Sequence, residues 1–239
     1  MSNSIIQLPD HILCYFLSLL PLRDAARIRS LVYEWRFLRD VRFYLLFDSY
    51  NVMGKEICCF TDENRCKFVA AIDQFMQFWS GTKISMLHIN IDLGKEHTSH
   101  INRWIQFAIQ KGVEKIDLNL IRTDANRESY LFPYVFKPCS LDSLRLKCLR
   151  LNNCKLDGYY HRNVSWLSRI ITLELSRVPL KMRDILAIFA GDSNLKSVTL
   201  SDCCLPTVVR INGSNCLKNL TIDELERSVT IKLNCPNLE

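Results

Sequence analysis

One motif recurs four times in this chain, as LRLNNCKL at residues 149–156, LELSRVPL at 173–180, VTLSDCCL at 198–205 and the shorter copy LTIDEL at 220–225. The first positions of successive copies are separated by 24, 25 and 22 residues (173 − 149, 198 − 173 and 220 − 198). A period of this length indicates a repeat architecture in which each copy is one structural unit. The segment therefore predicts a stack of similar turns.

The spacing within the motif has a physical cause. Two apolar residues on either side of a polar one lie on the same face of a short strand, while the side chain between them points outward. The residue three positions later (Cys154, Val178 or Cys203) enters the turn after the strand. Because no copy can bury its apolar side alone, the copies share one core, as leucine-rich repeats do. The alternative is an ordinary α/β domain whose strands merely look alike.

The composition favours a folded protein in a reducing compartment. Of the 239 residues, 48% are hydrophobic and 10% are aromatic, which can fill a substantial core. No apolar run is long enough to span a bilayer, and residues 1–20 lack the basic start and cleavage site of a signal peptide. The eleven cysteines have irregular spacing, so we expect reduced thiols in a cytoplasmic or nuclear protein, with no metal site.

The net charge of +6 is unevenly placed. Between Arg122 and Arg183 there are 12 Lys or Arg residues against 5 Asp or Glu, a local charge of +7 (12 − 5). This excess could form a basic surface for an acidic partner or for nucleic acid. The basic residues are scattered and are not interleaved with aromatic ones, which favours solvated positions on the repeats and argues against nucleic acid as a partner.

The first forty residues predict three short helices. In the first, which runs over 8–20 and ends at Pro21, the apolar side chains share one face: Ile12, Leu13, Phe16, Leu17, Leu20. A second helix is predicted from about Arg23 to Arg29, and a third around Tyr33 to Val41. Helices this short cannot bury all their apolar surface alone, so we expect part of it to contact a partner.

These helices resemble the F-box of plant F-box/leucine-rich-repeat proteins of the FBD type. The matching residues are LPDxIL at 8–13, Leu17, LP at 20–21, DAA at 24–26 and WRxL at 35–38. The resemblance continues through IxxWIxxA at 101–108, GVEKIDL at 112–118, LFPxxF at 131–136, SLxxLxL at 140–146 and the repeats. It therefore covers nearly the whole chain.

The resemblance implies an α/β fold with an N-terminal three-helix F-box followed by a right-handed α/β leucine-rich-repeat solenoid in an open horseshoe arc. We expect the F-box at 1–48, a helical linker packed on the first repeats at 49–85, and the repeats at 86–239. Related chains often carry further repeats and a C-terminal FBD domain, so we expect this chain to be truncated at its C-terminus.

The implied function is that of a substrate-recognition subunit of an SCF-type ubiquitin ligase, in which the F-box binds a Skp-type adaptor and through it cullin, and the repeats bind a protein target. By position, the adaptor-facing candidates are Leu8, Pro9, Ile12, Leu13, Leu17, Leu20, Pro21, Leu31, Trp35 and Leu38. The alternative for each of them is a place in the core of the F-box itself.

Three positions depart from the family pattern. Leu22 stands where the family often has a hydroxyl residue that caps the second helix, and Val32 to Trp35 replace a Ser-Lys-Arg-Trp start of the third. Arg39 replaces a common tryptophan. Two lost caps cost about 1 kcal/mol each. The alternative function is accordingly a leucine-rich-repeat scaffold or decoy with a degenerate, non-functional F-box.

No catalytic motif is found, so we expect a non-catalytic protein without cofactors. His97 and His100 lack a nearby third ligand, and Cys154 and Cys203 occupy repeat positions that predict burial, where thiols are inert. The target-binding candidates are outward residues on the repeat strands: Arg145, Arg150, Glu174 and Thr199. Further elements are predicted as helices at 64–79, 101–111 and 182–190 and as strands at 87–91, 116–120 and 229–233.

Overall fold

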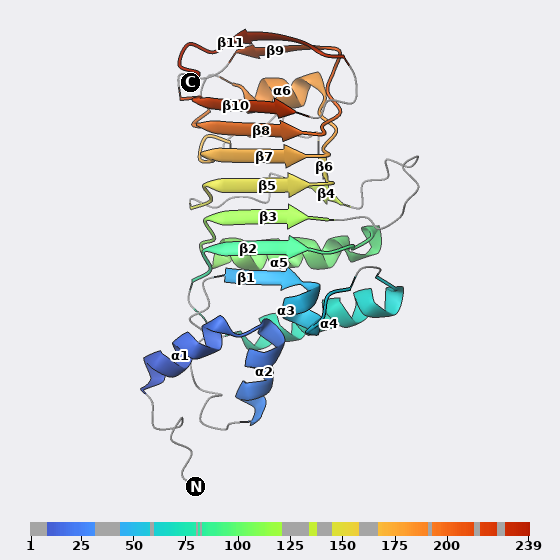
Figure 1. Cartoon of the computed structure of the whole chain (residues 1–239), viewed down its shortest axis with the longest axis vertical. Coiled ribbons are helices and arrows are strands. Elements are labelled where there is room, and N and C mark those ends of the chain that lie inside the picture. The colour runs from blue at the N-terminus through green and yellow to red at the C-terminus, as the bar shows by residue number, and fades with distance from the viewer. Residues whose placement is uncertain are drawn as a thin grey trace.

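A computed structural model of the chain describes residues 9–31, 44–57, 60–79, 81, 83–120, 134–137, 145–157, 167–190, 193–212, 216–223 and 228–239. Within these residues the centre of the molecule is one parallel sheet of seven strands (Figure 1). In spatial order the strands are β1 (Tyr44–Asp48), β2 (Met86–Asn90), β3 (Lys115–Asn119), β5 (Cys148–Asn152), β7 (Thr172–Ser176), β8 (Ser197–Ser201) and β10 (Asn219–Asp223). Each new strand of the sheet is added beside the previous one, so the chain winds as a solenoid.

The pairing of the strands confirms the repeats. Leu149 of β5 pairs with Leu173 of β7, which pairs with Val198 of β8, which pairs with Leu220 of β10. Each step from one copy of the motif to the next is therefore a single turn of the solenoid. Along β5, β7 and β8 the second and fourth residues are buried, because these are the apolar positions of the motif.

The sheet extends further toward the N-terminus than the motif does. Leu45, Leu87 and Ile116 continue the same row from Leu149. The predicted strands at 87–91 and 116–120 are confirmed by β2 and β3, while β1 was not predicted and falls in the range 1–48 expected for the F-box. Its alternation of buried Leu45 and Phe47 is the signal that would have identified it.

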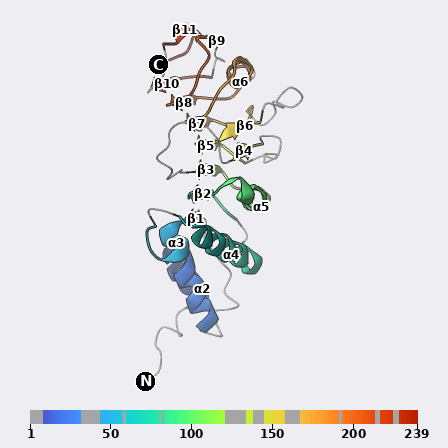
Figure 2. The same ribbon diagram turned by 90° about the vertical axis from the view of Figure 1, so that its right-hand side faces the viewer.

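The segments that connect the strands lie on one side of the sheet and leave its other face open (Figure 2). They include helices at the three ranges that the sequence predicts, namely α4 (Asp62–Phe78), α5 (Thr98–Gln110) and α6 (Met182–Ile188). The shorter ones are α3 (Ser49–Met53), β4 (Val135–Phe136) and β6 (Lys155–Leu156). Because these segments cover a single face, every second residue of the strands is buried and the residues between face outward.

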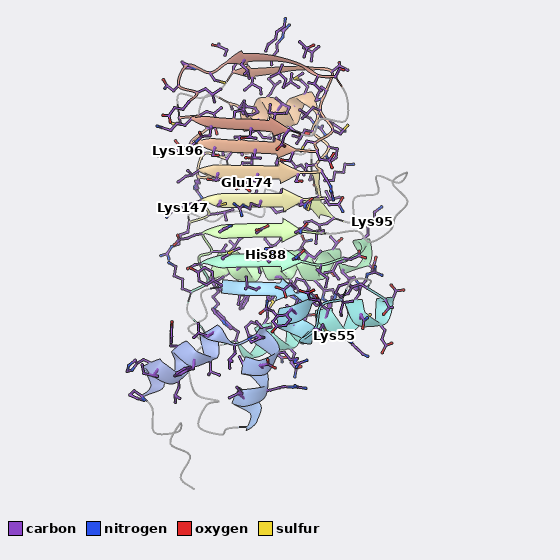
Figure 3. All side chains as sticks on the ribbon, in the orientation of Figure 1. Lys55, His88, Lys95, Lys147, Glu174 and Lys196 are labelled. Carbon is purple, nitrogen blue, oxygen red and sulfur yellow. The ribbon has the colours of Figure 1, made fainter. Side chains whose placement is uncertain are left out.

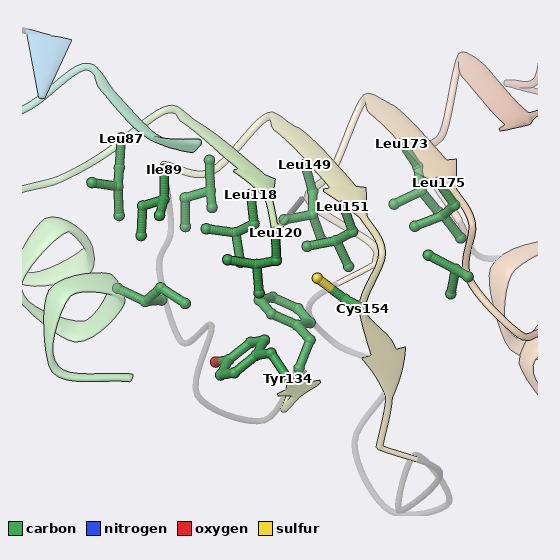
Figure 4. Packing of buried hydrophobic residues seen from close by; sticks show 14 of the residues in the cluster. Leu87, Ile89, Leu118, Leu120, Tyr134, Leu149, Leu151, Cys154, Leu173 and Leu175 are labelled. Atoms are coloured by element: carbon green, nitrogen blue, oxygen red, sulfur yellow. The ribbon is translucent and has the colours of Figure 1, made fainter. Parts of the chain in front are cut away.

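The core runs without interruption from Leu22 to Leu217. At its lower end Trp104 of α5 contacts Phe47 and Phe68 edge-on, with ring centroids 5.7 and 6.5 Å away. Farther along, the layers hold leucines of successive strands together with Tyr134 (Figure 4). This shared core is why no single turn is stable alone.

The repeat cysteines are buried as predicted. Burial raises the pKa of the Cys154 thiol far above its usual range and raises that of Cys203 to about 11. The Cys203 thiol donates to the carbonyl of Leu175, with Sγ 3.3 Å from the oxygen. Both thiols are therefore protonated and structural.

The last two turns differ from the predicted strand-and-helix pattern. Strand β9 (Val208–Asn212) follows β8 after the short segment 202–207, and β11 (Thr230–Asn234) follows β10 after the short segment 224–229. The strand expected at 229–233 is present as β11, but it pairs with β9 on the connecting side and does not extend the main sheet. The connection between β8 and β10 thus contains a strand where the connection between β7 and β8 contains α6.

Three equivalent residues make the turn at the end of a strand. Asn153, Arg177 and Asp202 follow β5, β7 and β8 directly and have φ of 57°, 52° and 51°, respectively. This left-handed backbone bends the chain out of the sheet. The Nε of Arg177 lies 3.0 Å from Oδ2 of Asp202, so neighbouring turns are also joined by an ion pair.

The N-terminal residues form two helices, α1 (Asp10–Leu19) and α2 (Leu22–Leu31), as predicted. Leu13, Leu17 and Ala25 make a small core between them, while Leu22 belongs to the main core. Arg23 Nη1 donates to the carbonyl of Met53 at 2.7 Å, which joins α2 to α3. The third helix predicted around 33–41 lies outside the described residues.

None of the helices in the described ranges combines the length and the apolar character that crossing a bilayer requires.

Candidate functional site

The open face of the sheet carries a row of ionisable side chains, one from each of four adjacent strands. The strand register places His88 of β2, Asp117 of β3, Arg150 of β5 and Glu174 of β7 side by side. Each occupies the outward position between the two buried residues of its strand. We call these four residues the charged row; His88 and Glu174 are labelled in Figure 3.

Neighbouring side chains of the charged row are paired. His88 Nδ1 lies 3.3 Å from Asp117 Oδ2, and Arg150 Nη1 lies 4.0 Å from the same oxygen. Arg150 Nε lies 2.7 Å from Glu174 Oε2. Parallel strands are about 4.8 Å apart, which is the spacing that lets side chains on adjacent turns meet. Asp117, Arg150 and Glu174 therefore present fixed charges of alternating sign to a partner.

The pairing keeps the carboxylate of Asp117 ionised. Burial raises its pKa, but the neighbouring His88 ring and the charge of Arg150 outweigh this, so the pKa lies below its usual range. The folded state thus binds a proton at this site less readily than the unfolded chain does.

Asp117 should therefore contribute stability above an unfolded-state pKa of about 3.9, and this contribution should disappear as pH falls through the lowered folded pKa. We expect Asp117→Asn to cost about 1 kcal/mol at neutral pH and to reduce the loss of melting temperature between about pH 5 and about pH 3. Thermal melts of both proteins over this range measure the difference. Asp223→Asn, at an exposed position of β10, is the control. Parallel melting curves for wild type and Asp117→Asn would contradict the prediction.

The four predicted target-binding residues are only partly brought together. Arg150 and Glu174 pair on the open face, and Thr199 is the outward residue of the next strand, β8. Arg145 lies three residues before β5, where its side chain passes over Gly112 at the edge of the sheet. It is therefore not one of the strand residues of the open face.

Two members of the charged row, His88 and Asp117, were missed by sequence reasoning. Both stand between the apolar residues of strands that were predicted, at Leu87-x-Ile89 and Ile116-x-Leu118. Extending the outward position of the motif to these strands would have found them.

A row of amides borders the charged row where the strands end. Asn119 Nδ2 donates to Asn90 Oδ1 at 2.9 Å, and Asn153 Nδ2 donates to the carbonyl of Leu120 at 2.7 Å. Within the described residues, the buried Oδ1 atoms of Asn119 and Asn152 accept no hydrogen bond.

The predicted adaptor-facing residues divide between the core of the helical pair and its surface. Leu13 and Leu17 are 4% and 7% exposed and belong to the core of α1 and α2. The others in the described ranges are Pro9, which is exposed, Ile12, Leu20 and Pro21, which are partly exposed, and Leu31, which ends α2. Leu8, Trp35 and Leu38 lie outside the described residues.

The outward face of α1 is apolar. Tyr15, Phe16 and Leu19 are 60%, 52% and 63% exposed. Leu19 lies about one turn after the adjacent pair Tyr15 and Phe16, and all three point away from the small core of Leu13 and Leu17. We call these three residues the apolar strip. Sequence reasoning assigned Phe16 to the apolar face of the helix but missed Tyr15 and Leu19, because the helix is apolar on nearly all sides.

Comparison with known proteins gives consistent results. The family model of the leucine-rich-repeat domain of At1g61320/AtMIF1 matches residues 75–239. The F-box/LRR-repeat protein At5g02910 of Arabidopsis thaliana is 29% identical over 219 residues, covering 92% of this chain and 43% of that protein. The putative F-box/FBD/LRR-repeat protein At3g59240, also of Arabidopsis thaliana, is 28% identical over 242 residues, covering 98% and 45%.

The F-box protein At3g59000 of Arabidopsis thaliana is 26% identical over 237 residues, covering 97% of this chain and 46% of that protein. The chain thus spans less than half the length of these three relatives. No solved structure matches the chain.

Proposed function

This chain belongs to the plant F-box/leucine-rich-repeat proteins, and from that membership we propose that it is a substrate-recognition subunit of an SCF-type ubiquitin ligase. The N-terminal helices would bind a Skp-type adaptor, and through it cullin, while the open face of the sheet would bind a protein target. The chain itself would perform no chemistry. Its contribution would be proximity, since holding a target beside the ligase raises the effective concentration of the target lysine.

The observation that carries this proposal is the presence of two separate surfaces of different chemistry. The apolar strip lies on α1, beyond the β1 end of the sheet, whereas the charged row crosses β2 to β7 (Figure 1). An exposed apolar strip on a small helical pair is suited to a permanent partner that covers it. A wide polar face with fixed charges is suited to selective recognition. A receptor subunit needs one surface of each kind.

The burial of Leu22 supports the proposal that the F-box is folded, although this residue departs from the family pattern. A leucine cannot cap α2 as a hydroxyl residue would, but its side chain is 3% exposed and lies in the main core. Burying a leucine contributes about 2 kcal/mol, which is more than the lost cap costs. The substitution thus fastens α2 to the repeats. We also propose that the F-box ends before Tyr44, because β1 is a strand of the sheet.

The proposed compartment is the cytoplasm or the nucleus. Seven cysteines in the described part of the chain are free thiols, which suits a reducing environment. Imaging of the tagged chain tests this, and a secreted product would contradict it.

The adaptor test is co-purification of the chain with a Skp-type adaptor. We expect Phe16→Ala/Leu19→Ala to lower the retained adaptor by about tenfold or more, because two exposed apolar anchors are removed while Leu13 and Leu17 keep the helical pair folded. A Leu13→Ala variant would be less informative, because it would also open a cavity in that small core.

The matched control is Tyr50→Ala/Leu186→Ala, which removes an aromatic residue and a leucine that are 55% and 56% exposed on α3 and α6. It should retain the adaptor at the wild-type level. Circular dichroism checks that all three proteins are folded. A folded wild type that retains no adaptor would overturn the proposal and favour a leucine-rich-repeat scaffold or decoy.

A further inference from the structure

A second charged surface lies at the edge where the strands begin, away from the charged row. It is formed by residues at two positions of each turn, namely three residues before the strand begins and one residue before it begins. In successive turns these positions hold the basic residues Lys83, Arg145, Lys147, Arg169, Lys196 and Lys218. We call these six residues the basic edge; Lys147 and Lys196 are labelled there in Figure 3.

Backbone hydrogen bonds fix the order of the turns along the basic edge. The amide of Ile171 donates to the carbonyl of Lys147 at 2.8 Å, and the amide of Lys196 donates to the carbonyl of Ile171 at 2.9 Å. The amide of Lys218 then donates to the carbonyl of Lys196 at 2.9 Å. With turns about 4.8 Å apart, Lys196 stands one turn from Lys218 and two turns from Lys147. The cations therefore form a line rather than a scatter.

Two carboxylates of the chain itself contact lysines at this edge. Glu114 lies in the same row as Lys147, and its two oxygens contact Lys83 Nζ at 3.0 Å and Lys147 Nζ at 3.5 Å. At the other end Glu239 Oε1 lies 2.7 Å from Lys218 Nζ. The hydrogen bond from Lys83 and the charges of both lysines lower the pKa of Glu114. The lysines of this edge thus already bridge and hold carboxylates of their own chain.

Among the described residues at these two positions, basic side chains outnumber carboxylates by six to one, the carboxylate being that of Glu114, and Glu239 adds a second carboxylate beside Lys218. Lys196 is exposed one turn before the Lys218 end of the line, and it makes no ion pair with any residue that the structure describes. A line of cations with such an available member attracts an extended anion.

We propose that the basic edge binds an extended acidic segment of a protein partner. Alternate side chains of an extended polypeptide are about 6.8 Å apart, so successive carboxylates reach lysines one or two turns apart on their flexible stems. Single-stranded nucleic acid fits less well, because such sites combine cations with aromatic side chains on which bases stack. Among the described residues, no exposed aromatic side chain lies between these lysines; the exposed Tyr44 begins β1, beside β2, and so lies beyond the Lys83 end of the line.

The test uses the full chain and a fluorescent decaglutamate peptide, with binding followed by fluorescence anisotropy at low and at physiological ionic strength. We expect binding that weakens as salt is added. Lys147→Glu/Lys196→Glu should weaken it by about tenfold or more at low salt. The matched control, Lys55→Glu/Lys95→Glu, changes the net charge equally at two exposed lysines that lie away from this edge (Figure 3), and it should bind within about twofold of wild type.

Three results would overturn the proposal. The first is no decaglutamate binding by the wild type at low salt. The second is an equal loss in the two charge-reversed variants, which would mean that only net charge matters. The third is about tenfold tighter binding of a ten-nucleotide thymine strand, which would assign the edge to nucleic acid. If charge reversal impairs folding, Lys147→Gln/Lys196→Gln replaces it, with about a threefold loss expected. The proposal does not depend on adaptor binding.

Discussion

Replacing Trp104 by alanine is expected to lower the free energy of unfolding by about 3–5 kcal/mol, which is a large part of the stability of a typical domain. Trp104 is fully buried on α5, where it fastens that helix to β1 through Phe47 and to α4 through Phe68. Its Nε1 also donates to Asp73 Oδ1 at 2.9 Å. The variant would leave a cavity and remove a hydrogen bond from a partly buried carboxylate. Urea unfolding followed by circular dichroism measures the loss.

Two further variants separate the contributions. Trp104→Phe keeps most of the volume but removes the donor to Asp73, so its stability should lie between those of Trp104→Ala and the wild type. Tyr44→Ala removes an exposed aromatic residue of β1 and should change the stability by less than about 0.5 kcal/mol. A loss below about 1 kcal/mol in Trp104→Ala would mean that α5 does not depend on this contact.

The second large effect is expected at the centre of the sheet, where Leu118→Ala should cost about 2–5 kcal/mol. Leu118 of β3 is fully buried, pairs with Ile89 on one side and Leu151 on the other, and lies in the layer seen in Figure 4. A repeat protein transmits stability through contacts between neighbouring turns, so a cavity here weakens the turns on both sides.

The matched substitution is Leu233→Ala in β11, because that leucine is 54% exposed at the end of the solenoid. It should change the unfolding free energy by less than about 0.5 kcal/mol. Denaturant unfolding of both variants measures the contrast. Equal losses at Leu118 and Leu233 would contradict the alignment of the turns described above.

Much of this architecture could be predicted, because the motif indicates which residues form a strand and its period indicates which strand lies beside it. The alternation in Leu149-x-Leu151 predicts which side chains are buried, and the step to Leu173 predicts which residue lies beside Leu149. Toward the N-terminus the steps are longer and unequal, since the same row continues through Ile116, Leu87 and Leu45. Without a constant period, β2 and β3 could be predicted as strands but not aligned, and β1 escaped notice.

The candidate surfaces were predicted less completely for the same reason. Arg150 and Glu174 were recognised as outward residues because they lie in regular copies, but their pairing with His88 and Asp117 requires the alignment of irregular turns. On α1 the sequence shows apolar residues on nearly every side. Whether Leu13 or Phe16 faces inward depends on how α2 crosses α1, which no local pattern specifies.

The change of connecting segment along the chain has a consequence for the shape of the open face. A helix is about 10 Å wide, whereas neighbouring strands are about 4.8 Å apart. A turn closed by α5 is therefore thicker at its back than at its front and acts as a wedge, while turns closed by β9 and β11 have nearly equal thickness on both sides. We accordingly expect curvature to concentrate around β2 and β3, where the charged row begins, and the face to flatten toward β10. A rigid, flat partner would therefore contact the face near β10 more readily, whereas a convex partner would fit the curved part at β2 and β3.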